Sequence, residues 1–162
     1  MNKPISLLHD DTIDRKVGKG FLEERGWWGI QYGGTYSLDL MVPEFSRGCD
    51  VEMNWYNHAH HFEDEGYFRV PYRKQKYWLD DGPWGKWKVD YIQFSDNDTK
   101  ELLWYPYKII EGFRNNLVVW KGLMDKGFTK DQSTFIRIPF VEGKKFITRW
   151  KLVNGTWTNI KW

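Results

Sequence analysis

The most regular feature of the sequence is the alternation of apolar and polar residues in short runs. Successive side chains of a β-strand point to opposite faces of the sheet, so each run predicts a strand with one buried and one solvated face. This one-sided pattern is typical of antiparallel sheets, because all-parallel sheets are buried on both faces. The clearest runs are Tyr36–Leu40, Asp50–Trp55, Phe68–Tyr72, Trp87–Tyr91, Ile136–Phe140 and Phe146–Trp150.

Turn-forming residues separate these runs at short intervals. Gly33-Gly34 fits a two-residue hairpin turn, because glycine reaches the positive φ that such turns require. Strands separated by ~8–12 residues are typical of sandwiches and barrels, and roughly nine or ten strands fit between residues 27 and 162. Pro71 and Pro139 lie inside two of the runs. Proline cannot donate to a β-ladder, so each is expected at an edge, a bulge or a strand end.

The N-terminal part of the chain has the periodicity of a helix. Apolar residues recur four apart from Ile13 to Phe21, which predicts a helix over Asp11–Glu24. A chain of 162 residues has the size of one domain. We therefore predict a single all-β domain over residues 1–162, in which a short N-terminal helix or arm (1–25) precedes an antiparallel sandwich or barrel (26–162).

Composition narrows the class of protein further. Aromatic residues make up 19% of the chain, which allows a large apolar area to be buried and excludes disorder. The net charge of +2 argues against a nucleic-acid partner, and no stretch of ~18 apolar residues predicts a membrane span. The single cysteine, Cys49, permits no internal disulfide, and the first residues do not read as a signal peptide. A cytoplasmic location is expected.

The start of the strand-rich region resembles a known superfamily. Gly26-Trp27-Trp28 is similar to the Gly-x-Trp that opens the first strand of lipocalins and of the wider calycin superfamily. In that superfamily a basic residue from a late strand packs over the tryptophan, and Arg149 occupies the most similar position here. The resemblance implies a calycin-like (lipocalin-like) antiparallel β-barrel of about eight to ten strands. For intracellular members it implies a fatty-acid-binding carrier, a bilin lyase or chaperone, or a small-acid decarboxylase.

Aromatic residues at inward positions indicate a ligand cavity. A small barrel is filled by its own side chains or holds one small ligand, and tyrosine and tryptophan bring polar tips into an apolar lining. We expect a small hydrophobic or conjugated ligand, such as a bilin or a fatty acid, bound by a carrier or chaperone, with a client protein as a further partner. The alternative is a core that the rings fill completely. The predicted lining residues are Tyr36, Trp55, Tyr72, Trp87, Tyr91 and Trp150.

Charged side chains complete the predicted cavity. Arg69, Arg137 or Arg149 would bind a ligand carboxylate, and of these Arg69 and Arg149 join the predicted ligand-binding residues. Alternation places Arg69 and Arg137 on the solvated face, so a clamp there requires a barrel mouth or a register break. If the barrel is a lyase, pocket tyrosines would act with an acid such as Glu52 or Glu63. The sequence identifies no cofactor.

A basic cluster surrounds Tyr72 and consists of Arg69, Arg73, Lys74 and Lys76. Basic residues that alternate with aromatics are found on surfaces that bind single-stranded nucleic acids. The near-zero net charge favours the simpler interpretation, an ordinary solvated sheet face.

A histidine cluster precedes the third run. His58, His60 and Glu65 have the His-x-His-x4-Glu spacing of the first metal motif of cupins. The second cupin element is missing, so we interpret the cluster as a polar loop and predict no metal site. His60, close to the acidic Glu63, remains a candidate for proton transfer or ligand contact.

A different class of function would use the aromatics at the surface. Trp78, Trp84 and Trp87 lie beside Gly82-Pro83 and could form a platform that stacks on sugar rings. The alternative to an internal cavity is therefore a tryptophan-rich module that binds carbohydrate or protein.

Overall fold

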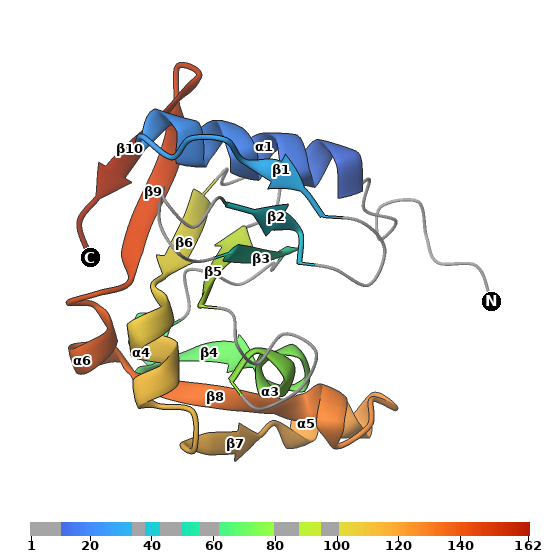
Figure 1. Cartoon of the computed structure of the whole chain (residues 1–162). Helices are drawn as coiled ribbons and strands as arrows, with labels where there is room; N and C mark the ends of the chain where they lie inside the picture. The colour runs from blue at the N-terminus through green and yellow to red at the C-terminus, as the bar shows by residue number, and fades with distance from the viewer. Residues whose placement is uncertain (1–10, 34–37, 43–49, 56–61, 80–87, 95–100) are drawn as a thin grey trace.

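The computed structural model describes residues 11–33, 38–42, 50–55, 62–79, 88–94 and 101–162 (Figure 1). In this part of the chain the strands form two sheets, and neighbouring strands are antiparallel except for β3 and β5, which are parallel. The large sheet has the order β1-β2-β3-β5-β6-β9-β10, formed by β1 (Gln31–Tyr32), β2 (Leu40–Met41), β3 (Asp50–Trp55), β5 (Val89–Phe94), β6 (Glu101–Tyr105), β9 (Thr148–Val153) and β10 (Thr156–Ile160). The small sheet has the order β4-β8-β7, formed by β4 (Tyr67–Pro71), β8 (Thr134–Pro139) and β7 (Leu117–Val119).

The helices are short except for the first. This helix, α1, spans Asp11–Glu24 and confirms the N-terminal helix that the apolar spacing predicts. The others are α2 (Phe62–Glu65), α3 (Tyr72–Leu79), α4 (Tyr107–Gly112), α5 (Lys121–Asp125) and α6 (Phe140–Gly143), with a 3-10 helix, η3, at Asp131–Ser133.

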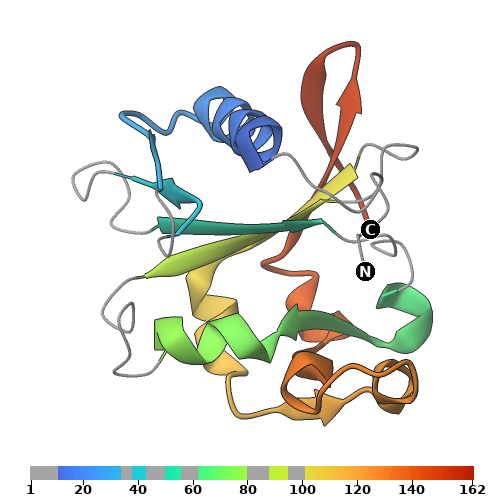
Figure 2. The ribbon, with the colours of Figure 1, turned by 90° about the vertical axis from the view of Figure 1, so that its right-hand side faces the viewer.

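The elements are arranged in three layers, with α1 on one face of the large sheet and the small sheet on the other (Figures 1 and 2). Each interface has its own core. In the core between α1 and the large sheet, Phe21 and Leu22 of α1 are fully buried together with Ile92 of β5. In the core between the two sheets, Phe68 of β4 and Tyr105 of β6 pack edge to face, with ring centroids 6.0 Å apart.

The central strand β5 is buried on both faces, unlike the one-sided strand that alternation predicts. Tyr91 faces the core between the sheets and Ile92 faces the core under α1. Asp90, which alternation places in solvent, is 7% exposed. Its carboxylate accepts hydrogen bonds from Trp104 Nε1 at 3.0 Å and from the backbone N–H of Tyr107 at 2.7 Å. The buried carboxylate therefore ties β5 to the first turn of α4.

A closed barrel is not seen in the described residues. The large sheet is open, with β1 and β10 as its terminal strands, and no strand pairing joins these two. The second sheet is separate and packs against the first, so a large share of the aromatic rings fills the space between layers. The part of the prediction that the structure supports is a mostly β fold with an N-terminal helix.

The ends of several strands differ from the prediction. Pro71 and Pro139 are the last residues of β4 and β8, so each lies at a strand end, one of the three positions predicted for a proline. Tyr72 and Phe140, which continue the alternating pattern, instead begin α3 and α6. Gly33 donates its N–H to the carbonyl of Asp39, next to the β1–β2 pairing. The predicted Gly33-Gly34 turn itself includes positions outside the described residues.

Candidate functional site

Half of the predicted ligand-binding residues have no described side chain. Tyr36, His60 and Trp87 lie outside the described residues. Trp55 and Glu52 belong to β3, in the middle of the large sheet, but their side chains lie outside the described part. Their roles stay predictions.

The aromatic residues that are described lie in two different cores. Tyr91 is 1% exposed and packs edge to face on Tyr105, with centroids 5.4 Å apart. Tyr72 is partly buried against the same core. Trp150 lies on the opposite face of the sheet, where its ring centroid is 5.2 Å from that of Phe21. These side chains are therefore part of the packing on both sides of the large sheet.

The two predicted arginines already have partners. Arg69 is 2% exposed, donates to Glu65 at 3.2 Å and stacks on Trp120, with its guanidinium carbon 4.0 Å from the ring centroid. Arg149 donates to Glu101 at 3.0 Å. A second anion would have to compete with a bound carboxylate at either guanidinium.

The indole that faces Arg149 is that of Trp162, at 5.8 Å. Trp28, the tryptophan of the calycin-like Gly-x-Trp, is 73% exposed, whereas the preceding Trp27 is buried against Trp104. The stacking of arginine over tryptophan occurs elsewhere, where Arg25 lies 4.4 Å from the ring centroid of Trp150.

The histidines of the polar cluster lie outside the described residues. Glu65, the third member of the His-x-His-x4-Glu spacing, ends α2 and pairs with Arg69. Within the described ranges, no group of three His, Cys, Asp or Glu side chains is arranged to hold a metal ion. The proposed sugar platform also falls outside the description, since Trp84 and Trp87 are not described and the side chain of Trp78 is not either.

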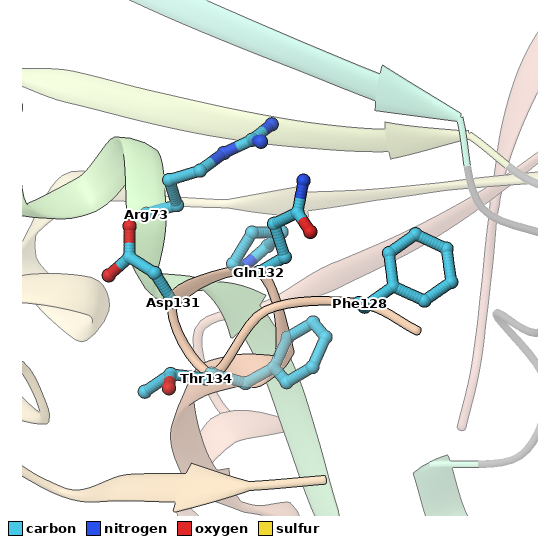
Figure 3. Close-up of a pocket in the computed structure, with 7 residues that line it drawn as sticks. Arg73, Phe128, Asp131, Gln132 and Thr134 are labelled. Carbon is cyan, nitrogen blue, oxygen red and sulfur yellow. The ribbon is translucent and has the colours of Figure 1, made fainter. Parts of the chain in front are cut away.

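A pocket of about 210 Å³ lies beside the small sheet, where α3 meets the segment before β8 (Figure 3). Its apolar lining comes from two phenylalanines of different segments and from the proline that ends β4. Phe128 is 47% exposed, whereas Phe135 is 4% exposed. The full set of lining residues is Pro71, Arg73, Phe128, Asp131, Gln132, Thr134 and Phe135.

A local hydrogen-bond motif gives the polar wall of the pocket its shape. Thr129 Oγ1 accepts from the N–H of Gln132 at 3.1 Å, and Gln132 Oε1 accepts from the N–H of Thr129 at 2.9 Å. This reciprocal pair is a capping box, which the sequence Thr-x-x-Gln favours at the start of a helical turn. The hydroxyl of Ser133 also donates to the carbonyl of Thr129. The turn therefore holds Gln132 in one orientation.

An ion pair fixes the same wall to α3. Lys76 Nζ donates to both carboxylate oxygens of Asp131, at 3.2 and 3.4 Å. Arg73, one turn earlier on α3, is exposed and has no salt-bridge partner among the described residues. Figure 3 shows the Arg73 guanidinium and the Gln132 amide extending to the same side, with the Phe128 ring beside them.

No family model, curated protein or solved structure matches this chain. The interpretation of the pocket therefore rests on its lining, and the calycin resemblance stays a prediction. Among the described helices, none is both long enough and apolar enough to cross a membrane.

The sequence pattern singled out one residue of this pocket but did not indicate its role. Arg73 belongs to the basic cluster around Tyr72, which alternation places on a strand, but it lies on a helix instead. Phe128 and Gln132 had no pattern that pointed to a site. The Thr129–Gln132 capping signature was the available signal, because it marks a rigid turn next to an exposed phenylalanine.

A titratable pair on α4 lies outside the pocket and gives a pH prediction. Partial burial, with the hydrogen bond that Tyr107 donates to Glu111 and the charge of Glu111, raises the pKa of Tyr107 from 10.0 to about 12. Because the folded-state pKa is raised, this contribution to stability is complete below pH 10 and is lost as the pH rises through 12. We expect Glu111→Gln to return the pKa of Tyr107 toward 10.0. NMR titration of tyrosine Cζ resonances measures this, with Tyr107→Phe to assign the signal, and an unchanged pKa in Glu111→Gln would contradict the pairing.

Proposed function

We propose that this protein binds a small ligand with a flat apolar part in the pocket between α3 and the segment that precedes β8. The ligand class is the small hydrophobic or conjugated one that the aromatic composition suggests. The proposed site is this pocket at the surface of the small sheet, in place of the interior of a barrel.

The observation that carries the proposal is the exposed ring of Phe128. A phenylalanine that is 47% exposed keeps apolar area in water, and a ligand that covers it gains about 25 cal/mol for each Å² removed from water. Phe135 and Pro71 supply further apolar contacts within the same pocket. Polar side chains at the edge of an apolar pocket are the usual arrangement in small-ligand sites.

The size of the pocket supports a ligand of one or two rings. Pockets for drug-sized ligands have about 300–1,000 Å³, and this one has about 210 Å³. A four-ring bilin is larger than such a site holds. Among the lining residues, the titratable groups are Arg73 and Asp131, and Asp131 is paired with Lys76. This set supports binding better than turnover.

The test is a titration followed by NMR, with phenylalanine ring signals as the probe. Three naphthalene derivatives with a carboxylate, a neutral amide and an ammonium group are added in turn, so that the result does not depend on the polar group. We expect at least one of them to shift the Phe128 signals, and Phe128→Ala to weaken its binding about tenfold, which corresponds to the loss of one ring face.

The matched control is Phe146→Ala. Phe146 is 55% exposed and does not line the pocket, so its loss removes the same kind of exposed side chain outside the pocket. The proposal fails if none of the three compounds shifts the Phe128 signals at millimolar concentration, or if both alanine variants bind equally well.

A further inference from the structure

The polar wall of the pocket presents hydrogen-bond donors to a ligand. The side-chain oxygen of Gln132 already has a hydrogen-bond partner, because Oε1 accepts from the N–H of Thr129 at 2.9 Å. The amide nitrogen has no acceptor among the described residues, and Figure 3 shows it turned toward the side on which the Arg73 guanidinium lies. The capping box therefore decides which end of the amide a ligand meets.

Arg73 adds a second set of donors at the same place. A guanidinium has five N–H donors and no acceptor, and it remains charged at every physiological pH. Arg73 is held on α3, whose start is fixed by Pro71 at the end of β4. Its planar group matches the two oxygens of a carboxylate in a bidentate arrangement.

The carboxylate and the hydroxyl of the lining make hydrogen bonds within the protein. Both oxygens of Asp131 accept from Lys76, and Figure 3 shows this carboxylate directed away from Gln132. The hydroxyl of Thr134 donates to the carbonyl of Lys130 at 2.6 Å. A ligand group between Arg73 and Gln132 therefore meets N–H groups, which favours an acceptor at that place.

We propose that the polar group of the ligand is a carboxylate, bound between the Arg73 guanidinium and the Gln132 amide nitrogen while the ring lies on Phe128. This deepens the proposed function and rests on it. One guanidinium and one neutral amide suit a single negative charge, and the nearby Asp131 carboxylate disfavours a dianion such as a phosphate monoester.

The experiment compares 2-naphthylacetate with 2-naphthylacetamide and 2-naphthyl phosphate by isothermal titration calorimetry and NMR. The first two compounds share the same ring and differ in charge. We expect the carboxylate to bind about tenfold more tightly than the amide, the effect of one charge-assisted hydrogen-bonded pair. Arg73→Gln should remove this preference and leave the affinity for the amide within about twofold.

The sharpest variant is Gln132→Glu. Glutamate is as good as glutamine in a capping box, so the turn and the melting temperature should be retained. The new carboxylate replaces the N–H donors with a negative charge, so we expect the affinity for 2-naphthylacetate to fall about tenfold or more. Arg137→Gln is the matched control, because Arg137 is an exposed arginine that does not line the pocket, and it should bind as the wild type does.

The outcomes separate the two proposals. If the amide binds as tightly as the carboxylate and Phe128→Ala weakens both, the carboxylate assignment is wrong and the pocket remains a ligand site. Tighter binding of the phosphate also overturns the carboxylate assignment. If none of the compounds shifts the Phe128 signals, the proposed function itself fails.

Discussion

Alanine at position 143 is expected to lower the free energy of unfolding by about 1–3 kcal/mol, the usual cost of adding a methyl group to a packed core. Gly143 ends α6 and is buried, and a Cβ built there would lie 2.6 Å from the ring of Phe68 and 3.0 Å from Ile138. Phe68 is fully buried and already contacts the rings of Phe140 and Trp162, with centroids 5.4 and 5.0 Å away. The ring therefore has little room to move away.

Urea unfolding followed by tryptophan fluorescence measures this change. The matched control is Gly112→Ala, since Gly112 also ends a short helix and a Cβ there would meet no atom within 4 Å. We expect Gly112→Ala to be neutral or slightly stabilising. Equal unfolding free energies for the two alanine variants would contradict the close packing of Gly143 on Phe68.

Removal of the Asp90 carboxylate is the second large expected effect. Asp90→Ala leaves the indole N–H of Trp104 and the backbone N–H of Tyr107 without this acceptor, and a hydrogen bond to a charged group contributes about 1.5–3 kcal/mol. Pro106, the residue before α4, makes no side-chain cap, so Asp90 takes that role from a neighbouring strand. We expect a loss of about 3 kcal/mol in the free energy of unfolding.

Asp90→Asn is the informative comparison, because asparagine retains one acceptor oxygen and should lose less than alanine does. Asp125→Ala, at an exposed position on α5, controls for the change in charge. Chemical denaturation gives the three values, and the indole N–H signal of Trp104 reports the lost bond directly. A loss in Asp90→Ala no larger than in Asp125→Ala would show that the buried carboxylate does not stabilise the fold.

The pattern of neighbouring residues predicted the features that depend only on neighbouring residues. The spacing from Ile13 to Phe21 gave the helix over Asp11–Glu24, because an apolar stripe needs only one face to cover it. Because proline has no N–H to donate, Pro71 and Pro139 were expected at an edge, a bulge or a strand end, and they end β4 and β8. Alternation beyond Pro71 and Pro139 misled, since one more apolar residue fits the first turn of a helix as well as the next step of a strand.

The pairing of strands could not be predicted in this way. Parallel β3 and β5 require a crossover connection, and β4 and α3 lie on the chain between them. A period of two says which faces are apolar but does not say which strands are neighbours, so an open sheet with a second sheet on top has the same pattern as a barrel. The burial of Asp90 could not be predicted either, because it depends on contact with α4, which the alternation within β5 does not show.

The pocket depends on contacts between distant segments and was therefore missed. Arg73 and Gln132 are brought to one place by the pairing of Lys76 with Asp131 across 55 residues. The predicted clamps Arg69 and Arg149 have the right chemistry but acquired carboxylate partners from their own surroundings. A sequence shows which side chains can bind an anion and does not show which of them remain available.

The position of α1 has a consequence for synthesis of the chain. The ring of Phe21 packs against Trp150 and Trp157, and Arg25 donates to the carbonyl of Trp157. The ribosome makes α1 before these strands, so the part of its apolar stripe that packs on β9 and β10 stays uncovered until they have been made. Slow elongation between α1 and β10 would prolong the interval in which chaperones or other nascent chains reach that part of the helix.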